Sequence, residues 1–250
     1  MKPLDVVLPC RVTGTRLYGK PLQLIDIQNN ITILENLVRY IMDTGIFGRI
    51  CLAISEEEEN HGFIRLAKAK DWDYITGSPH DVLGRVNKAT EFLQCEHIGF
   101  ASTENPFIFT EQLPQIYERH VKENLDFSMQ SDLPDGAAFS ILKTEALRIS
   151  HRDGTDRHRS ELVTSYVFDN KEKFKMNNMA PPEELRRSNI RLTVDYPEDL
   201  IFCRQVYMSL KGYERLIPLR EIVQFWDTHP VLRKPLETIG IDWGHGRLWD

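Results

Sequence analysis

The sequence has few cysteines and no long apolar run. Its four cysteines, Cys10, Cys51, Cys95 and Cys203, are widely separated and include no C-x-x-C pair. This spacing argues against a disulfide framework or a zinc site and indicates reduced thiols in a cytoplasmic protein. No apolar run approaches the roughly 20 residues that span a bilayer, and no signal-peptide pattern opens the chain. We therefore expect a cytoplasmic protein without a membrane segment.

An excess of positive charge is also missing. The chain has 31 Lys and Arg against 37 Asp and Glu, a net charge of −6, which argues against a nucleic-acid partner. Basic residues gather only locally, in the opening segment and in "HRDGTDRHR" at residues 151–159. Local basic clusters on an acidic protein suit a small anionic ligand. His151 and His158 are not spaced as metal ligands, so we expect no zinc there.

Short apolar runs alternate with helical periodicities over the first half of the chain. The runs that favour strands are residues 3–10, 48–55, 71–78, 96–103 and 125–131, and the segments that favour helices are 32–45, 57–70, 81–94 and 110–123. This alternation predicts parallel β-α-β units with helices on both faces, in an open sheet that extends through about residue 130. Ligands of such sheets bind at the carboxyl ends of the strands.

The second half is less regular. We expect a strand running into a helix at 136–150, a helix at 160–170, and a strand, a turn and a long helix at 190–210. The segment 230–250 is loop-like and carries two of the four tryptophans. Because this tail is rich in aromatic residues, we expect it to dock on the rest of the protein or on a second subunit and not to be disordered.

The stretch "GTRLYGKP", residues 14–21, is close to the phosphate-loop pattern G-x-x-x-x-G-K-[ST], but Pro21 stands at its last position. The next convincing helix begins a dozen residues later, so no helix N-terminus is available to hold phosphates, and we reject that interpretation. What remains is a loop in which Gly14 and Gly19 permit close backbone approach and three cations, Arg11, Arg16 and Lys20, favour an anion. From this loop alone, an ordinary basic surface loop stays equally open.

The residues around this loop extend the pattern to one that resembles the signature of a known family. "LPCRVTGTRLYGKPL", residues 8–22, resembles the signature P-A-R-x-x-S-x-R-L-P-G-K-x-L of the cytidylyltransferases that activate acidic sugars. The nearest branch is that of the SpsF-like spore-coat polysaccharide proteins, related to the CMP-Kdo synthetases. The basic residues and Gly19 match, whereas Cys10, Gly14 and Tyr18 replace the usual Ala, Ser and Pro.

Other segments resemble the same family in the same order, over roughly residues 4–210. "GSPHDVLGRVNKA" resembles G-S-x-x-D-V-L-x-R and carries Asp81 and Arg85. "ASTENPFI" stands where the family has T-G-D-x-P-L-I, so Glu104 occupies the place of a metal-binding Asp and Thr103 that of a Gly. "LPDG" and "RSELVTSYVFDN" resemble P-D-G and R-E-H-V-T-P-Y-I-Y-E-N, and "IRLTVDYPEDL", with Asp195, matches L-R-L-T-V-D-x-P-E-D-L.

The resemblance implies a Rossmann-like nucleotidyltransferase (GT-A-like) fold, three-layer α/β/α with a mixed, mostly parallel sheet, over residues 1–210. It places the acceptor side at about 127–190, followed by a C-terminal helix and tail at 211–250 that dock on the domain or on a partner subunit. It also implies a homodimer that uses CTP and Mg²⁺ in surface-glycan assembly. The hydroxyl of a Kdo- or sialic-acid-like sugar attacks the α-phosphate, and pyrophosphate is released.

The resemblance also assigns roles to residues. Arg11, Arg16 and Lys20 become the catalytic cations, and Glu104 and Asp195 the metal ligands. The nucleotide contacts are Pro9, Cys10, Arg11, Gly14, Thr15, Arg16, Lys20, Asp81, Arg85 and Ser102. The acceptor contacts are Asp135, Arg157, Arg159 and Glu161.

Each of these positions has a simpler alternative. Asp195 could cap the helix that begins at Pro197. Asp81 and Arg85, four residues apart, could form a surface ion pair. The segment 151–159 could be a solvated loop, and Asp135 with Gly136 only a turn.

Two other functions remain open. An enzyme of the same fold could use another nucleoside triphosphate, or a sugar phosphate or small phosphate as the acceptor. A catalytically inactive nucleotide-binding partner protein would account for the departures at Tyr18, Thr103 and Glu104. A dinucleotide oxidoreductase is disfavoured because no G-x-G-x-x-G follows the first strand. Glycosyl transfer is disfavoured because no strand ends in D-x-D.

Overall fold

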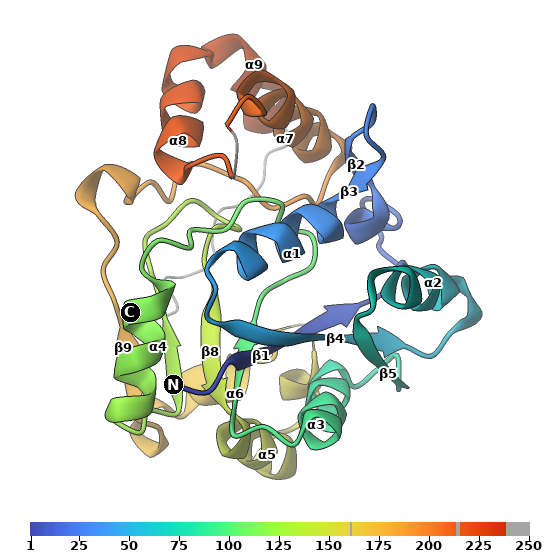
Figure 1. Cartoon of the computed structure of the whole chain (residues 1–250), viewed down its shortest axis with the longest axis vertical. Helices are drawn as coiled ribbons and strands as arrows, with labels where there is room; N and C mark the ends of the chain where they lie inside the picture. The colour runs from blue at the N-terminus through green and yellow to red at the C-terminus, as the bar shows by residue number, and fades with distance from the viewer. Residues whose placement is uncertain (161, 214–215, 239–250) are drawn as a thin grey trace.

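The computed structural model describes residues 1–160, 162–213 and 216–238. Within them a seven-stranded sheet has the order β5-β4-β1-β6-β8-β7-β9 (Figure 1). The strands are β1 (Leu4–Cys10), β4 (Phe47–Ser55), β5 (Asp73–Gly77), β6 (His97–Phe100), β7 (Phe127–Met129), β8 (Ser140–Lys143) and β9 (Met176–Asn178). All pairs are parallel except those of β8, which runs antiparallel to β6 and β7. The expected mixed, mostly parallel sheet is confirmed, although it continues beyond residue 130.

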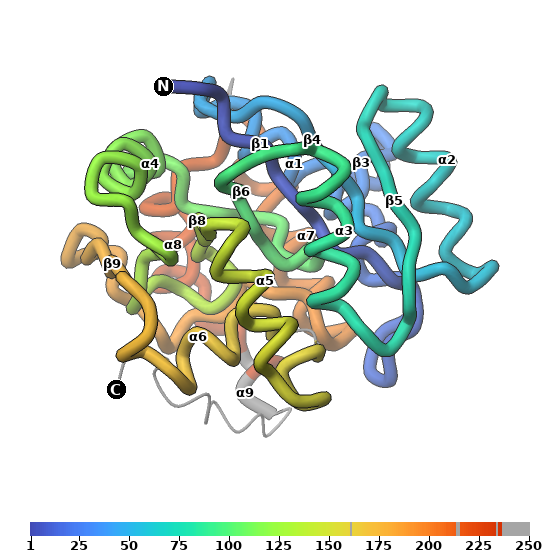
Figure 2. The backbone as a smooth tube through the Cα atoms, turned by 90° about the horizontal axis from the view of Figure 1, so that it is seen from below, coloured from blue at the N-terminus to red at the C-terminus, as the bar shows by residue number. Residues whose placement is uncertain are grey.

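Helices cover both faces of the sheet because β1 is apolar on both sides. Val6 and Leu8 face a core shared with α1 (Ile33–Asp43), α2 (His61–Lys70) and α4 (Leu113–Lys122). Val7 faces a second core shared with α3 (Val82–Leu93), α5 (Thr144–Asp153) and α6 (Ser165–Asp169). Figure 2 shows α3, α5 and α6 together on the side seen from below. The result is a three-layer α/β/α arrangement.

The first half of the chain follows the sequence prediction closely. Thr32 caps α1 in a capping box with Glu35, and Gly45 follows the helix with φ +70°. The segments 57–70, 81–94 and 110–123 contain α2, α3 and α4, and 136–150 contains β8 and most of α5. A short antiparallel hairpin, β2 (Leu24–Asp26) and β3 (Ile31–Thr32), lies between the opening loop and α1. No long helix therefore follows Lys20 directly, as expected.

Three expectations in the second half are wrong. Residues 190–195 form no strand, only an isolated parallel bridge between Asp135 and Arg191. The backbone of this segment forms hydrogen bonds to Asp135 on one side and to Glu104 on the other. Neither of these residues lies in a strand, so no ladder of strand pairing forms. The helix expected at 160–170 spans only α6. Residues 230–238, expected as a loop, are helical, and the rest of that tail lies outside the described residues.

The C-terminal part forms a layer of helices over the first core. α7 (Pro197–Leu210), α8 (Leu219–Thr228) and α9 (Pro230–Thr238) contact one another. The Trp226 ring of α8 packs edge-on against Phe202 of α7, with centroids 5.2 Å apart. Both side chains belong to the same core cluster as β1 and α1, so this layer and the sheet share one hydrophobic core.

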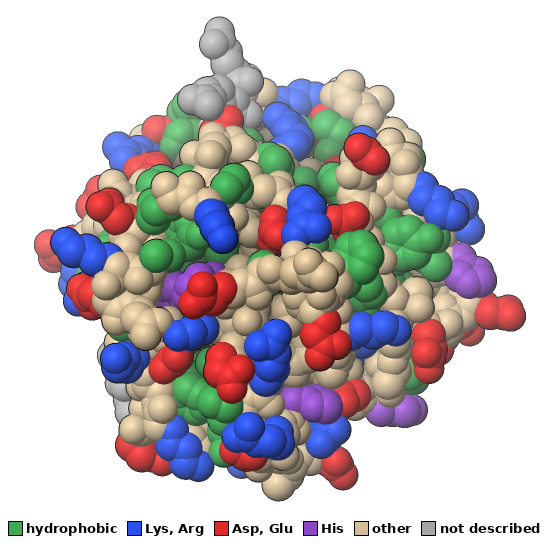
Figure 3. Space-filling view, turned by 60° about the horizontal axis from the view of Figure 1, so that its bottom comes forward, with side chains coloured by type: hydrophobic (Ala, Val, Ile, Leu, Met, Phe, Trp, Pro, Cys, Tyr) green, Lys and Arg blue, Asp and Glu red, His purple; other side chains and the backbone are tan. Residues whose placement is uncertain are grey.

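Two surface observations bear on function. No helix in the described part of the chain is long and apolar enough to cross a membrane. On the face drawn in Figure 3, acidic and basic side chains are interspersed, with no continuous basic surface.

Candidate active site

The opening loop lies at the carboxyl end of β1, between β4 and β6, where the strand order reverses. Such a point is where open α/β sheets bind ligands. The loop closes on itself because the Gly19 N–H donates to the Val12 carbonyl at 2.8 Å. Gly19 has φ +61°, and a Cβ on Gly14 would lie 2.7 Å from the Leu17 carbonyl oxygen, so both positions favour glycine. The buried Asn60 holds the base of the loop by accepting the Val12 N–H at 2.8 Å.

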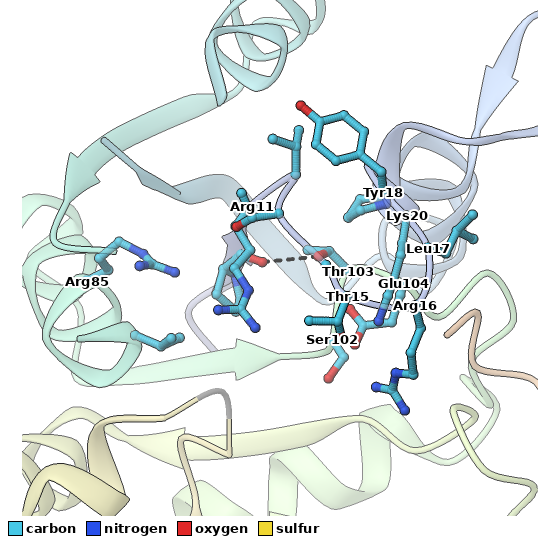
Figure 4. A pocket seen from close by; sticks show the side chains of 16 residues that line it. Arg11, Thr15, Arg16, Leu17, Tyr18, Lys20, Arg85, Ser102, Thr103 and Glu104 are labelled. Atoms are coloured by element: carbon cyan, nitrogen blue, oxygen red, sulfur yellow. Dashed lines mark hydrogen bonds between the residues drawn. The ribbon is translucent and has the colours of Figure 1, made fainter. Parts of the chain in front are cut away.

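The loop borders a cavity of about 470 Å³, within the range of ~300–1,000 Å³ for small-molecule sites (Figure 4). Its remaining walls come from the loop after β6 and from the start of α3. The lining residues include nine of the sequence-predicted site residues: Pro9, Arg11, Gly14, Thr15, Arg16, Lys20, Arg85, Ser102 and Glu104. The fold therefore brings together in one cavity residues that are more than 90 positions apart in the chain.

Arg85 is a buried cation on the wall opposite Lys20 and Arg16, with Arg11 between them (Figure 4). Its guanidinium donates to the carbonyls of Ala53 and Ser78, at 3.3 and 2.6 Å. Burial lowers the pKa of Arg85, and the nearby charge of Arg11 acts in the same direction. Among the described residues no carboxylate forms an ion pair with Arg85. The negative charges of Glu57 and Asp81 nevertheless act on it and favour its charged form. Because Arg85 also lines the cavity, it can contact an anion bound there.

The surface ion pair between Asp81 and Arg85, one of the alternatives, does not form. Asp81 caps α3 by accepting the Gly84 N–H at 2.7 Å, and its other oxygen lies 2.7 Å from His151 Nε2 and 3.2 Å from Arg159 Nη1. Burial alone would raise the pKa of Asp81, but these contacts keep it below its usual value. Asp81 does not line the cavity itself.

Asp195 is not one of the residues that line the cavity, but it binds three cations, two of which do. Its Oδ1 accepts from Lys20 Nζ at 2.5 Å and from Arg16 Nη2 at 3.0 Å, and its Oδ2 accepts from Arg191 Nη2 at 2.6 Å. Burial alone would raise the pKa of Asp195, but Lys20, Arg16 and Arg191 together lower it. The helix-cap alternative is wrong, because the N-cap of α7 is Tyr196.

The second candidate metal ligand, Glu104, is held beside Asp195 through the backbone. The Val194 N–H donates to the Glu104 carbonyl at 3.1 Å, so the two acidic residues come from neighbouring chain segments. Thr103, in place of the family glycine, is accommodated because its buried hydroxyl donates to the Pro9 carbonyl at 3.1 Å.

This donor set can be compared with what a metal needs. Carboxylate oxygens suit Mg²⁺, which commonly uses one or two of them together with phosphate oxygens and water. Among the described residues no cluster of three or more His, Cys, Asp or Glu side chains could hold a metal ion by itself. A metal held by Glu104 and Asp195 would therefore need further ligands, such as phosphate oxygens and water.

Three of the four predicted acceptor residues, Asp135, Arg157 and Arg159, do not line the cavity. Asp135 accepts from Arg191 at 3.0 Å, and Arg159 lies against Asp81 and His151. Arg157 pairs with Asp169 at 3.1 Å and is 75% exposed, as expected for a solvated loop. Glu161 lies outside the described residues.

Cys10 and Arg191 show two limits of the sequence prediction. The Cys10 thiol donates to the Leu8 carbonyl, and burial raises its pKa. Because the whole residue is buried and does not line the cavity, the predicted nucleotide contact of Cys10 is not supported. Arg191, which the sequence analysis did not single out, binds Asp195 directly. The available signal was a charged side chain inside the apolar run "IRLTV", where an unpaired cation is costly to bury.

Comparison with known proteins agrees with this geometry. Residues 6–231 match the family model described as "Cytidylyltransferase". The chain is 24% identical to the spore coat polysaccharide biosynthesis protein SpsF of Bacillus subtilis, over 92% of this chain and 96% of that protein.

Two solved structures show the same fold. A cytidylyltransferase from Leptospira borgpetersenii superimposes with a TM-score of 0.82 at 18% identity, covering 93% of this chain and 97% of that one. A CMP:2-keto-3-deoxy-manno-octonic acid synthetase in complex with CTP gives 0.61 at 11% identity, over 84% of this chain and 99% of that one. The expected Rossmann-like nucleotidyltransferase fold is confirmed.

Proposed function

Because this chain belongs to the cytidylyltransferase family, and is therefore a nucleotidyltransferase that uses CTP, we propose that it transfers CMP to an acidic sugar in a Mg²⁺-dependent reaction. Pyrophosphate is the second product, and the CMP-sugar serves surface-glycan assembly. The protein works in the cytoplasm as a homodimer. The spore-coat polysaccharide role in the name of SpsF and the sugar acid in the name of the synthetase support this choice of acceptor.

The observation that carries the proposal is the arrangement of charges around the cavity. Arg11, Arg16, Lys20 and Arg85 line one space large enough for a nucleotide. Of the two acidic residues, Glu104 lines the cavity on the side of Lys20 and Arg16, and Asp195 binds both of these cations directly. Cations to neutralise a triphosphate, together with carboxylates for a metal, are what phosphoryl-type transfer requires from a protein.

In the proposed reaction, the anomeric hydroxyl oxygen of the acceptor forms a bond to the α-phosphorus of CTP. The bond from that phosphorus to the bridging oxygen breaks, the electron pair leaves with pyrophosphate, and the hydroxyl proton passes to solvent. Lys20 and Arg16 turn from Asp195 to the phosphate oxygens, where they stabilise the charge that develops on the leaving group. Bound Mg²⁺ would add positive charge at the phosphates, held by Asp195 and Glu104. The rigid loop contributes by placing the phosphates in line with the acceptor.

The nucleotide half is tested by calorimetric titration of CTP, UTP, GTP and ATP, with and without Mg²⁺. We expect CTP to bind at least tenfold more tightly than the others when Mg²⁺ is present. Preference for another nucleotide would contradict the choice of base. No binding of any nucleotide would contradict the nucleotide half of the proposal.

The acceptor half is tested by pyrophosphate release from CTP with a panel of Kdo- and sialic-acid-like sugars, sugar phosphates and small phosphates. The Asp195→Ala variant should lose the release that a sugar acid supports. The control is Asp227→Ala, which removes a carboxylate paired with Arg187 on the surface, at 2.7 Å, away from the cavity. Full activity of Asp195→Ala would contradict the metal assignment, and activity only with phosphates would contradict the acidic sugar.

A further inference from the structure

Arg191 is buried yet surrounded by negative charge. Its side chain is 4% exposed and binds three carboxylates. Its Nε donates to Asp199 at 2.9 Å, its Nη1 to Asp135 at 3.0 Å, and its Nη2 to Asp195 at 2.6 Å. Burial alone would lower the pKa of Arg191, but these acidic partners raise it above its usual value. Nη2 also donates to the second oxygen of Asp199, at 3.2 Å, so all three nitrogens of the guanidinium are held by carboxylates.

The two oxygens of Asp195 have different neighbours. Oδ2 is held by Arg191, from behind the site. Oδ1 faces the cavity cations, Lys20 and Arg16. Lys20 and Arg16 stand on the loop that borders the cavity and can turn to a ligand, whereas Arg191 is enclosed. When the loop cations leave, Oδ1 becomes available and Oδ2 does not.

The position of Arg191 is itself fixed by the backbone. Asp199, 2% exposed, binds Arg191 and also accepts the backbone N–H groups of Asp195 and Tyr196, both at 2.8 Å. On the other side, the Asp135 N–H donates to the Ile190 carbonyl at 2.8 Å. Arg191 thus joins the start of α7, the acidic residue at the cavity and the segment around Asp135.

We propose that Arg191 is a positioning residue that reserves Oδ2 of Asp195, so that a metal can bind this carboxylate only through Oδ1. This inference rests on the proposed function, because it gives Asp195 the metal role. Mg²⁺ demands near-octahedral geometry, which a carboxylate bound through one oxygen satisfies more easily than one bound through two. A side chain that orients a metal ligand typically changes metal affinity by about 10–100-fold when it is replaced.

The first test replaces Arg191 by lysine, which keeps the charge but lacks the rigid planar fork of donors that reaches the three carboxylates. Mn²⁺ is titrated by electron paramagnetic resonance in the presence of a non-reactive methylene analogue of CTP. We expect the Mn²⁺ affinity of Arg191→Lys to fall at least about tenfold. The matched control is Arg187→Lys, four residues earlier, whose guanidinium binds a single surface carboxylate, Asp227. Its Mn²⁺ affinity should equal that of the unmodified protein.

The comparison is made where circular dichroism shows all three proteins folded. A purely structural Arg191 would change the melting temperature but not the affinity of the folded variant for Mn²⁺. Unchanged affinity in folded Arg191→Lys would overturn the inference.

The second test needs no variant and holds even if Arg191→Lys does not fold. It is a crystal structure of the unmodified protein with Mn²⁺ and the same CTP analogue. We expect Mn²⁺ on Oδ1 of Asp195 with Arg191 still bound to Oδ2. A metal bound to both oxygens would overturn only the inference about Arg191. A metal away from Asp195 would overturn the metal assignment of the proposed function and the inference with it.

Discussion

Asp195 shows how much one carboxylate can organise in the free protein. It neutralises two cations of the opening loop and is oriented by a third, all by direct hydrogen bonds of 3.0 Å or less. The same loop cations are those that the proposed function assigns to the triphosphate. A nucleotide therefore competes with Asp195 for Lys20 and Arg16.

This competition leads to a prediction for Asp195→Asn. We expect the variant to bind CTP without metal about fivefold more tightly, because pairs worth about 1 kcal/mol no longer have to be broken. Pyrophosphate release should nevertheless fall at least about a hundredfold, since the carboxylate for Mg²⁺ is lost. Calorimetry in the presence of a chelator measures the first effect, and a pyrophosphate assay the second. Weaker metal-free binding by Asp195→Asn than by an Asp227→Asn control would contradict the competition.

The pH dependence of stability gives a second prediction. The pKa of Asp195 is lowered in the folded state, so its ion pairs stabilise the fold fully above the ordinary carboxyl pKa of about 3.9. That contribution is lost as the pH falls through the lowered value. We expect the difference in free energy of unfolding between the unmodified protein and Asp195→Asn to be constant from pH 7 to about 5 and to shrink below about pH 4. Denaturant titrations across this range measure it, and a difference that grows on acidification would contradict the assignment.

The loop cations were predictable from a local pattern, whereas Arg85, Ser102 and Glu104 were predictable only through the resemblance to a family. Arg11, Arg16 and Lys20 stand in one loop, so their common position followed from the sequence. Arg191 did not, because its three carboxylates come from positions up to 56 residues away. The apolar run around Arg191 indicates burial, but nothing in the linear pattern shows which carboxylates pair with it.

At the scale of elements, the alternating strands and helices up to β7 were predictable because their periodicity is set by burial on both faces of one sheet. The segment 190–195 has the composition of a strand but no ladder to join. Its backbone groups pair with Asp135 and Glu104 instead. Pairing between segments depends on the tertiary arrangement, which composition does not report.

The close approach of this segment to Gly136 gives a third prediction. Gly136 has φ +89°, and a Cβ there would lie 2.6 Å from the Thr193 backbone nitrogen. We expect Gly136→Ala to destabilise the protein by about 3 kcal/mol or more, through the positive φ and the overlap together. Gly45→Ala is the control, because Gly45 has φ +70° with no atom within 4 Å, and it should cost about 1–2 kcal/mol. Equal losses in urea denaturation would show that the contact yields without cost.

At the scale of the whole molecule, the C-terminal helices and the sheet share one core. Phe202 and Trp226 pack in the same cluster as β1 and α1. The boundary predicted near residue 210 therefore falls between helices that contact each other, α7 and α8. Because the sheet and the C-terminal helices share one hydrophobic core, we expect them to unfold in a single cooperative transition.

A fourth prediction tests this continuity. Trp226→Ala should cost about 3–5 kcal/mol and lower the melting temperature of the whole protein by about 10 °C, in one transition. Met208→Ala, on α7 but 39% exposed, should change stability by less than about 0.5 kcal/mol. Calorimetry distinguishes the outcomes. A separate early transition in Trp226→Ala would show that the C-terminal helices form a second unit.

The pairing of Lys20 and Arg16 with Asp195 also bears on how the free protein coexists with the small anions of its surroundings. Orthophosphate would contact the loop cations but would leave Oδ1 of Asp195 without a partner, because Arg191 holds only Oδ2. Under the proposed function, a nucleotide that arrives with a divalent cation would replace both members of the pair at once. Asp195 thus acts as a weak internal competitor for Lys20 and Arg16, at a fixed and very high local concentration. This arrangement selects for a nucleotide with a bound cation over a lone anion, because only an anion and a cation together can displace Asp195 without leaving a charge unpaired.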